Sequence, residues 1–182
     1  MRKVKGVLLK FFVKSIRANK TGIYNDLLSE EDMGIVNKRI LDGAWYSYEA
    51  FKNCFNAVCK VDGRDNVKVI QKWGYNRGKE TLERLYKEPL MKRDLSGAVN
   101  SYNTLFKLWF NFGKQYGEIQ SENEVNIIIE DFDKDFRLFY YIAMGWMQGF
   151  FEIYTSTTIT AKFLEKPWEG ADKMVVNLSW NS

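Results

Sequence analysis

Apolar side chains recur at helical spacing along most of this chain. Between residues 4 and 18 they fall three or four positions apart, while lysine and arginine occupy the opposite side. The same period predicts further helices at 29–40, around 51–58, and at 66–87, 99–112 and 136–154. Ser29, followed by three acidic residues, has the composition of a helix N-cap and first turn.

Three other segments have the pattern of β-strands, near 124–132, 156–164 and 174–180. The first is short and β-branched, and the second alternates threonine and lysine with apolar residues. The predicted fold is therefore α+β, with about five to six helices packed on a small three-stranded antiparallel sheet. Because the chain shows no repeat, linker or low-complexity segment, a single domain covering residues 1–182 is expected.

Two of the predicted helices carry glycine pairs four residues apart. Gly74 and Gly78 lie in the helix at 66–87, and Gly145 and Gly149 lie in the helix at 136–154. A glycine inside a helix costs about 1 kcal/mol relative to alanine, so such a pair indicates that another backbone comes close. We expect these two helices to cross at their glycines.

Aromatic residues make up 16% of the chain, which is more than a core of this size requires. One interpretation is a core packed mainly with rings, and the other is an aromatic-lined pocket for a small apolar ligand. Five rings on inward-facing helix positions are the pocket candidates: Trp73, Trp109, Tyr140, Trp146 and Phe150.

The chain contains no histidine. This excludes Ser-His-Asp and Cys-His catalysis, and it removes the commonest metal ligand and the usual haem ligand. The pairs of neighbouring acids have the positions of helix caps, and no glycine-rich phosphate loop is present. We therefore expect no enzyme activity, no metal site and no cofactor.

Two cysteines, Cys54 and Cys59, lie five residues apart on one predicted helix. Two thiols are too few for a zinc site, and their positions on different helix faces do not favour a disulfide. Buried structural thiols are the first interpretation, and a modified thiol is the alternative. Free thiols without a signal peptide indicate the cytoplasm. The longest apolar run, 138–147, is about half of a membrane span, so no transmembrane segment is expected.

The net charge of +4 is modest, and the basic residues are spread along the chain, so nucleic-acid binding is not expected. The helix at 4–18 is the most basic segment. It is interpreted either as a core helix with a solvated basic face, or as a weak contact with an anionic membrane surface.

The order of several landmarks resembles an uncharacterised bacterial family of similar length. The landmarks are Gly6, Trp45-Tyr46, a long helix with Gly74 and Gly78 that ends at Tyr86, the Gly145-Trp146-x-x-Gly149 helix with Glu152, a hairpin, a glycine before the last strand, and Ser179-Trp180. More remotely, the chain resembles the superfamily of haem–nitric-oxide-binding domains, 4-vinyl reductase domains and palmitoylated TRAPP subunits. That resemblance implies an α+β ligand-binding module with an apolar pocket.

The chain departs from each of these relatives. The haem–nitric-oxide sensors use a proximal histidine and a tyrosine–serine–arginine motif, whereas here Tyr154-x-Ser156-x-Thr158 ends in threonine. The vinyl reductase domains often carry a metal-binding cysteine cluster, which two cysteines do not supply. The TRAPP subunits carry an acyl chain on a cysteine, a role for which only Cys54 and Cys59 are available.

These observations predict a non-catalytic sensory or regulatory module that binds a small apolar molecule or lipid between its helices and its sheet. The alternative is a protein–protein interaction module that acts as a homodimer or docks a partner, because a hairpin with a threonine-rich face can pair edge to edge.

Overall fold

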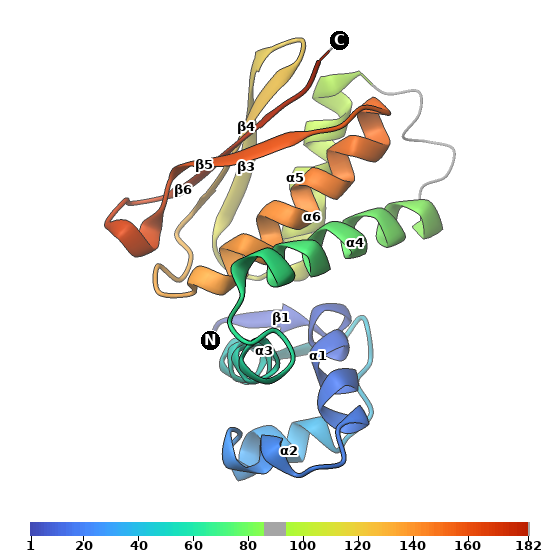
Figure 1. Cartoon of the computed structure of the whole chain (residues 1–182), viewed down its shortest axis with the longest axis vertical. Coiled ribbons are helices and arrows are strands. Elements are labelled where there is room, and N and C mark those ends of the chain that lie inside the picture. The colour runs from blue at the N-terminus through green and yellow to red at the C-terminus, as the bar shows by residue number, and fades with distance from the viewer. Residues whose placement is uncertain (86–93, 182) are drawn as a thin grey trace. The chain divides into compact units, whose positions relative to one another are not determined.

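The computed structural model describes residues 1–85 and 94–181, without the side chains of 81–85. The chain forms two compact units, Met1–Asn66 with Leu108–Phe112, and Val67–Lys107 with Gly113–Ser182 (Figure 1). The predicted helix end near Tyr86 and Pro89 lies outside the described residues. The expectation that residues 1–182 act as a single ligand-binding domain stays a prediction.

The first unit consists mainly of helices. Its elements are β1 (Lys3–Lys5), α1 (Gly6–Ala18), the 3-10 helix η1 (Ile23–Asp26), α2 (Glu30–Val36), β2 (Trp45–Ser47) and α3 (Tyr48–Val61). Helix α2 begins at a complete capping box, in which the Ser29 hydroxyl accepts from the Asp32 N–H and the Asp32 carboxylate accepts from the Ser29 N–H. The short strands β1 and β2 pair antiparallel, and Val4 also bridges to Phe110.

Aromatic rings fill the space between α1 and α3 in this unit. The ring centroid of Phe12 on α1 lies 5.8 Å from that of Phe51 and 5.0 Å from that of Phe55, both on α3, in edge-to-face arrangements. All three side chains are buried. The apolar face of the basic N-terminal helix is therefore used within the core of its own unit, which agrees with the first interpretation of that helix.

The second unit contains a four-stranded sheet, three α-helices and one 3-10 helix among its described residues. The elements are α4 (Val67–Leu85), α5 (Leu95–Trp109, whose last two residues belong to the first unit), β3 (Lys114–Ser121), β4 (Glu124–Glu130), α6 (Arg137–Thr155), β5 (Thr160–Glu165), the 3-10 helix η3 (Pro167–Glu169) and β6 (Met174–Ser179). The strand order is β3-β4-β6-β5, and every pair is antiparallel.

The α+β class is confirmed, but the single three-stranded sheet is wrong. The described residues hold six α-helices and two sheets, of two and four strands. The sequence pattern did not predict strand β3, because the segment Lys114–Ser121 is mostly polar and contains Gly117. In the structure Gly113 makes the turn, with φ +72°, and Gly117 lies inside β3. A Cβ at Gly117 would lie 2.6 Å from the Val99 side chain of α5.

One face of the four-stranded sheet carries the core. Gly117, Ile127, Val176 and Phe163 are aligned across its four strands. At one end of this row Gly117 meets α5, and at the other end the Phe163 ring contacts Tyr141 of α6 with centroids 5.1 Å apart. Helices α5 and α6 therefore pack on the same face of the sheet (Figure 1). The next row across the strands is polar: Glu118, Asn126, Asn177 and Lys162.

Helices α4 and α6 cross with their backbones in contact (Figure 1). A Cβ at Gly74 would lie 1.9 Å from the Ile142 carbonyl oxygen, and a Cβ at Gly145 would lie 1.9 Å from the Gln71 carbonyl oxygen. A Cβ at Gly78 would lie 2.5 Å from the Trp146 carbonyl oxygen, and a Cβ at Gly149 would lie 2.4 Å from the Tyr75 carbonyl oxygen. The structure thus places all four glycines at this crossing, where no side chain fits.

Candidate functional site

Two of the five candidate pocket rings come together in the second unit. Trp146 and Phe150 of α6 stack with centroids 5.5 Å apart, and Tyr102 of α5 lies 5.3 and 5.2 Å from them. Tyr102 and Phe150 are buried and Trp146 is half-buried. Burial raises the pKa of the Tyr102 hydroxyl well above its ordinary value. These three rings form an aromatic cluster (Tyr102, Trp146 and Phe150) that joins α5 and α6.

The other three candidates lie elsewhere. The buried Tyr140 ring stacks on Trp168, with centroids 5.4 Å apart, and lies 6.2 Å from Phe132. Trp73 is half-buried on α4, and Trp109 belongs to the first unit. The structure therefore divides the predicted set among several packing environments, and ligand binding by any of these rings stays a prediction.

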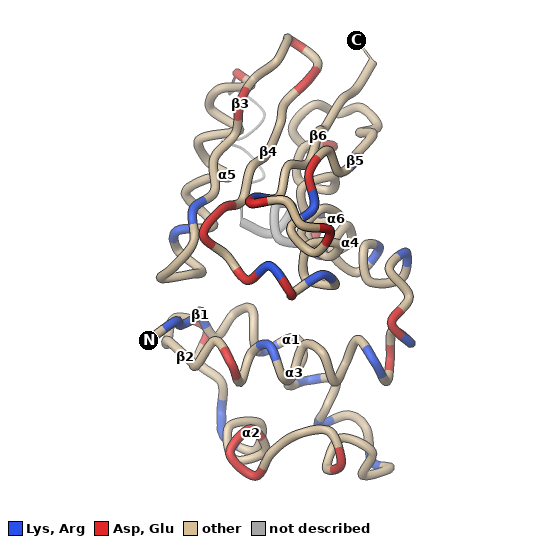
Figure 2. Tube along the Cα trace, turned by 90° about the vertical axis from the view of Figure 1, so that its left-hand side faces the viewer, with Lys and Arg blue, Asp and Glu red and all other residues tan. Residues whose placement is uncertain are grey.

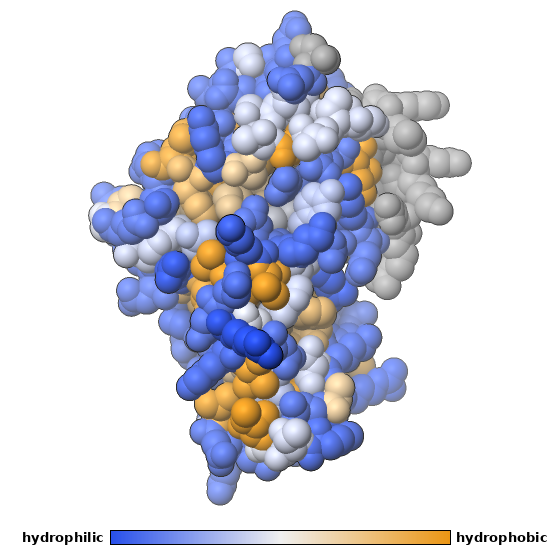
Figure 3. Space-filling model, viewed as in Figure 1, coloured by the Kyte–Doolittle hydropathy of each residue, from blue (hydrophilic) through white to orange (hydrophobic). Residues whose placement is uncertain are grey.

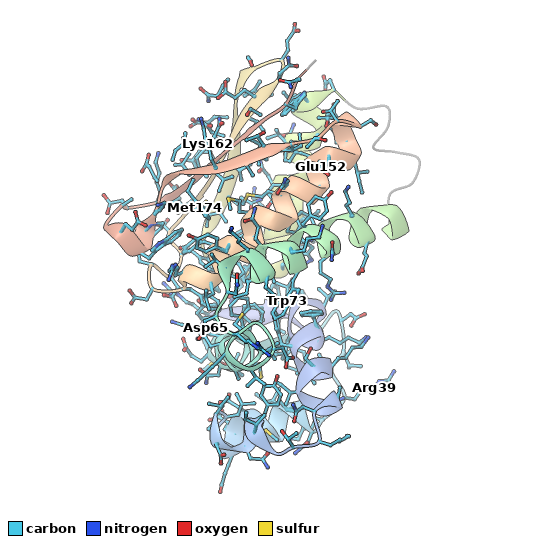
Figure 4. The ribbon with its side chains drawn as sticks, in the orientation of Figure 1. Arg39, Asp65, Trp73, Glu152, Lys162 and Met174 are labelled. Carbon is cyan, nitrogen blue, oxygen red and sulfur yellow. The ribbon has the colours of Figure 1, made fainter. Side chains whose placement is uncertain are left out.

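A polar network lies beside the glycine crossing, centred on Glu152 of α6 (Figure 4). The Tyr75 hydroxyl donates to Glu152 Oε2 at 2.6 Å, and the Lys79 ammonium lies 3.0 Å from the same oxygen. The backbone N–H of Ile159 donates to Glu152 Oε1 at 3.3 Å. The Glu152 side chain is only 10% exposed, so these partners replace most of its water.

The pKa of Glu152 reflects two opposing effects. Burial raises the pKa of the carboxyl, but the hydrogen bonds from Tyr75, Lys79 and the Ile159 N–H, with the charge of Lys79, outweigh burial. The net result is a pKa below the ordinary value, so Glu152 is ionised at neutral pH. Gln148 completes the network, since its amide donates to the Ile159 carbonyl oxygen at 2.8 Å.

The sequence interpretation noted Glu152 only as a landmark and overlooked the rest of this network. A usable signal was nonetheless present. Each glycine-bearing helix carries a polar pair four residues apart next to its glycines, Tyr75 and Lys79 on α4, and Gln148 and Glu152 on α6. Residues four apart share a helix face, and the backbone contact at the glycines brings the two pairs within hydrogen-bonding distance.

Both cysteines lie on α3 with no exposed surface. Burial, with a smaller contribution from Asp32, raises the pKa of the Cys54 thiol to about 12. Burial together with Asp65 raises the pKa of Cys59 to about 12 as well. Both side chains are therefore protonated at neutral pH, which is the state of an unreactive structural thiol.

Within residues 1–85 and 94–181, no group of three or more Cys, Asp or Glu side chains is arranged to hold a metal ion. Among the same residues, none of the helices combines the length and the apolar composition that crossing a membrane requires.

Of three comparisons with known proteins, only the comparison with solved structures finds matches. No protein-family model matches the chain, and no curated protein matches its sequence. Among solved structures, an H-NOX protein from S. oneidensis in the Fe(II)NO ligation state superposes with a TM-score of 0.66 at 14% identity, covering 98% of this chain and 99% of that one. The chain has an H-NOX-like fold.

Two further H-NOX structures agree. An oxygen-binding H-NOX domain related to soluble guanylate cyclases has a TM-score of 0.62 at 12% identity, covering 98% of this chain and 95% of that one. A structure that probes haem distortion in the H-NOX family has a TM-score of 0.63 at 13% identity, with the same coverages. The predicted resemblance to haem–nitric-oxide-binding domains is thereby confirmed at the level of the fold.

These neighbours overturn the expectation that the chain takes no cofactor, since the proteins that share its fold are haem proteins. The expectation rested on the missing histidine, which excludes one axial ligand and not the haem itself. Proteins also hold haem iron through thiolate, phenolate or thioether groups.

The residue types present in this chain limit which side chains could ligate haem iron. Histidine is absent, which excludes imidazole ligation, and the two thiols lie fully buried on α3, which disfavours thiolate ligation. Tyrosines and methionines are the remaining donor types.

Proposed function

We propose that this chain is a non-catalytic sensory or regulatory module that binds a small apolar ligand. The observation that carries the proposal is the H-NOX-like fold, which extends over 98% of the chain. The H-NOX neighbours include a nitric-oxide-ligated protein and an oxygen-binding domain, so this fold serves ligand binding in other proteins. The identity of the ligand depends on the residues of the site.

The aromatic cluster is the site that we propose for the ligand. Tyr102, Trp146 and Phe150 place large apolar surfaces between α5 and α6. Aromatic walls with few polar groups favour apolar guests, because their burial removes nonpolar area from water. Trp146 is half-buried, whereas Tyr102 and Phe150 are buried, so Trp146 is the ring of the cluster that solvent reaches.

Tryptophan emission tests this site. The purified protein would be titrated with fatty acids, aromatic metabolites and hemin, with hemin binding followed by its own absorbance, and the protein as purified would be analysed by mass spectrometry. We expect a saturable shift of emission with one class of ligand. Trp146→Phe should remove the shift, whereas Trp168→Phe, which alters a ring outside the cluster, should retain it.

The proposal fails if no ligand co-purifies and neither emission nor hemin absorbance changes. It also fails in its choice of site if Trp146→Phe leaves the shift intact while Trp168→Phe removes it. The homodimer or partner-docking alternative and the cytoplasmic location stay predictions. Light scattering over a wide concentration range would test the homodimer.

A further inference from the structure

Strand β3 forms one margin of the four-stranded sheet. The strand order is β3-β4-β6-β5, and Figure 2 shows β3 on the outer side of β4. Within residues 1–85 and 94–181, the β3 backbone forms hydrogen bonds with β4 and accepts one from its own Gln120 side chain, at the Glu118 carbonyl oxygen. The other N–H and C=O groups that point away from β4 are therefore available to a further strand.

The two margins of this sheet differ in regularity. The pairing of β3 with β4 is continuous from Lys114 to Ile119, and its register shifts only between Ile119 and Ser121. At the other margin, the register of β5 shifts between Phe163 and Glu165, close to the end of that shorter strand. Because a bulge disrupts the edge on which it lies, β3 offers the longer regular edge for pairing.

The side chains of β3 alternate between the two faces of the sheet. Gly117 faces Val99 of α5, so Lys114, Tyr116 and Glu118 lie on the opposite face. In Figure 3 the surface over the tip of the β3–β4 hairpin is mainly hydrophilic. A partner held by backbone hydrogen bonds and charge therefore suits this edge better than an apolar ligand does.

The charges on this face are exposed. The Lys114 side chain is 66% exposed, and its ammonium group lies 2.8 Å from Asp131 of the same chain. An ammonium group has three donors, so Lys114 can bridge to a second carboxylate. The Glu118 side chain is exposed, and its carboxylate forms no hydrogen bond or ion pair with another described residue.

We propose that two copies of this chain pair antiparallel through β3, with a two-fold axis at Tyr116. In such a pair, residues equally far from Tyr116 on either side lie opposite each other, so Lys114 of each copy faces Glu118 of the other. The two Tyr116 rings face each other at the axis, and aromatic and opposite-charge pairs across strands are both stabilising. This assigns the predicted homodimer to β3 rather than to the threonine-rich hairpin. The surface is separate from the proposed ligand site and does not depend on it.

Analytical ultracentrifugation of the full chain tests this pairing. Over protein concentrations from about 1 to about 200 µM at low salt, we expect a monomer–dimer equilibrium with a dissociation constant on the order of 10 µM, because one pair of strands buries little area. Glu118→Lys places lysine opposite Lys114 at both ends of the paired strands, and Lys114→Glu places glutamate opposite Glu118. Each substitution should weaken self-association about tenfold, since like charges directly opposite are destabilising.

The two variants should pair with each other. In the mixed dimer both facing pairs again have opposite charges, so native mass spectrometry should detect the heterodimer at concentrations where each variant alone is monomeric. Variants with the circular dichroism of the wild-type chain that stay monomeric when mixed would overturn the proposal. A wild-type chain that stays monomeric over the whole concentration range would overturn it as well.

Glu165→Lys is the matched control, because it makes the same change of charge at an exposed position of β5, on the other margin of the sheet. It should leave the dissociation constant unchanged, and a weakening equal to that of Glu118→Lys would overturn the proposal. Hydrogen exchange resolved by peptide gives a second readout, since exchange in β3 should slow as the concentration of the wild-type chain rises. A dimer that forms without slower exchange in β3 would use another surface, which would also overturn the proposal.

Discussion

Two helix pairs, α1 with α3 and α4 with α6, are held together by different kinds of contact. In the first unit, α1 and α3 pack through side chains, with the Phe12 ring edge-on against Phe51 and Phe55. In the second unit, α4 and α6 touch backbone to backbone at four glycines and are joined at the side by the Glu152 network. A ring-filled interface can adjust its spacing when a side chain changes, whereas a backbone contact leaves nothing to rearrange.

The comparison predicts that the α4–α6 pair is the less tolerant of the two. Gly145→Ala places a Cβ 1.9 Å from the Gln71 carbonyl oxygen, so the helices must separate. We expect the free energy of unfolding to fall by about 3 kcal/mol or more, measured by urea denaturation. Gly74→Ala should behave in the same way, because its Cβ would meet the Ile142 carbonyl oxygen at the same distance.

Gly34→Ala on α2 is the control for this substitution. A Cβ at Gly34 meets no atom within 4 Å, so only the helix propensity changes. Alanine should stabilise this position by about 0.5–1 kcal/mol. If Gly145→Ala and Gly34→Ala change stability by similar amounts, the backbone contact between α4 and α6 is not as described.

The second largest effect is expected at Glu152. Glu152→Gln keeps the size of the side chain but removes the charge that holds Lys79 and Tyr75. Charge-assisted hydrogen bonds contribute about 1.5–3 kcal/mol, so a loss of about 2 kcal/mol is expected in the same denaturation experiment. Glu122→Gln, at an exposed turn, should be neutral, and an equal loss in both variants would contradict the role of the network.

The same network makes the second unit sensitive to acid. The pKa of Glu152 is lowered in the folded state, so the unfolded chain binds the proton first as the pH falls. The contribution of Glu152 is fully present above its ordinary pKa of about 4.5 and is lost as the pH falls through the lower folded value. Wild-type protein should therefore lose more stability than Glu152→Gln as the pH falls from about 5 to about 3, and parallel curves would contradict this.

A smaller effect is expected in the first unit. Phe55→Leu removes the ring contact with Phe12, which lies 5.0 Å away, and leaves an apolar side chain in its place. Because α1 and α3 can move together, we expect a loss of about 1 kcal/mol. Hydrogen exchange resolved by peptide should locate the change in α1 and α3, and unchanged exchange in both helices would contradict this role of the Phe55 ring.

The smallest effect concerns the two thiols of α3. Cys54 and Cys59 are buried, and their pKa values are raised to about 12, so thiolate is scarce at pH 8. We expect 5,5′-dithiobis(2-nitrobenzoic acid) to modify neither thiol in the native protein and both in denaturant. Rapid modification of the native protein would show that α3 opens far more readily than its packing indicates.

The sequence by itself determined the features that depend on local chemistry. The amphipathic period located the helices, the Ser29 cap marked the start of α2, and the β-branched run 124–132 located β4. The paired glycines also pointed to a close helix crossing, because a glycine inside a helix is destabilising unless a backbone contact offsets it. These signals lie within a few residues of one another, so no tertiary information is needed to recognise them.

Only the tertiary structure decided which distant residues meet. Gly117 belongs to β3 because it pairs with Ile127 of β4, and Val99 occupies the space where its side chain would stand. The local pattern of β3 reveals neither contact. The Glu152 network joins Tyr75 and Lys79 of α4 with the loop residue Ile159 that precedes β5. The pocket candidates were divided among separate clusters. Helical periodicity assigns a ring to an inward face, but the path of the backbone decides which rings it touches.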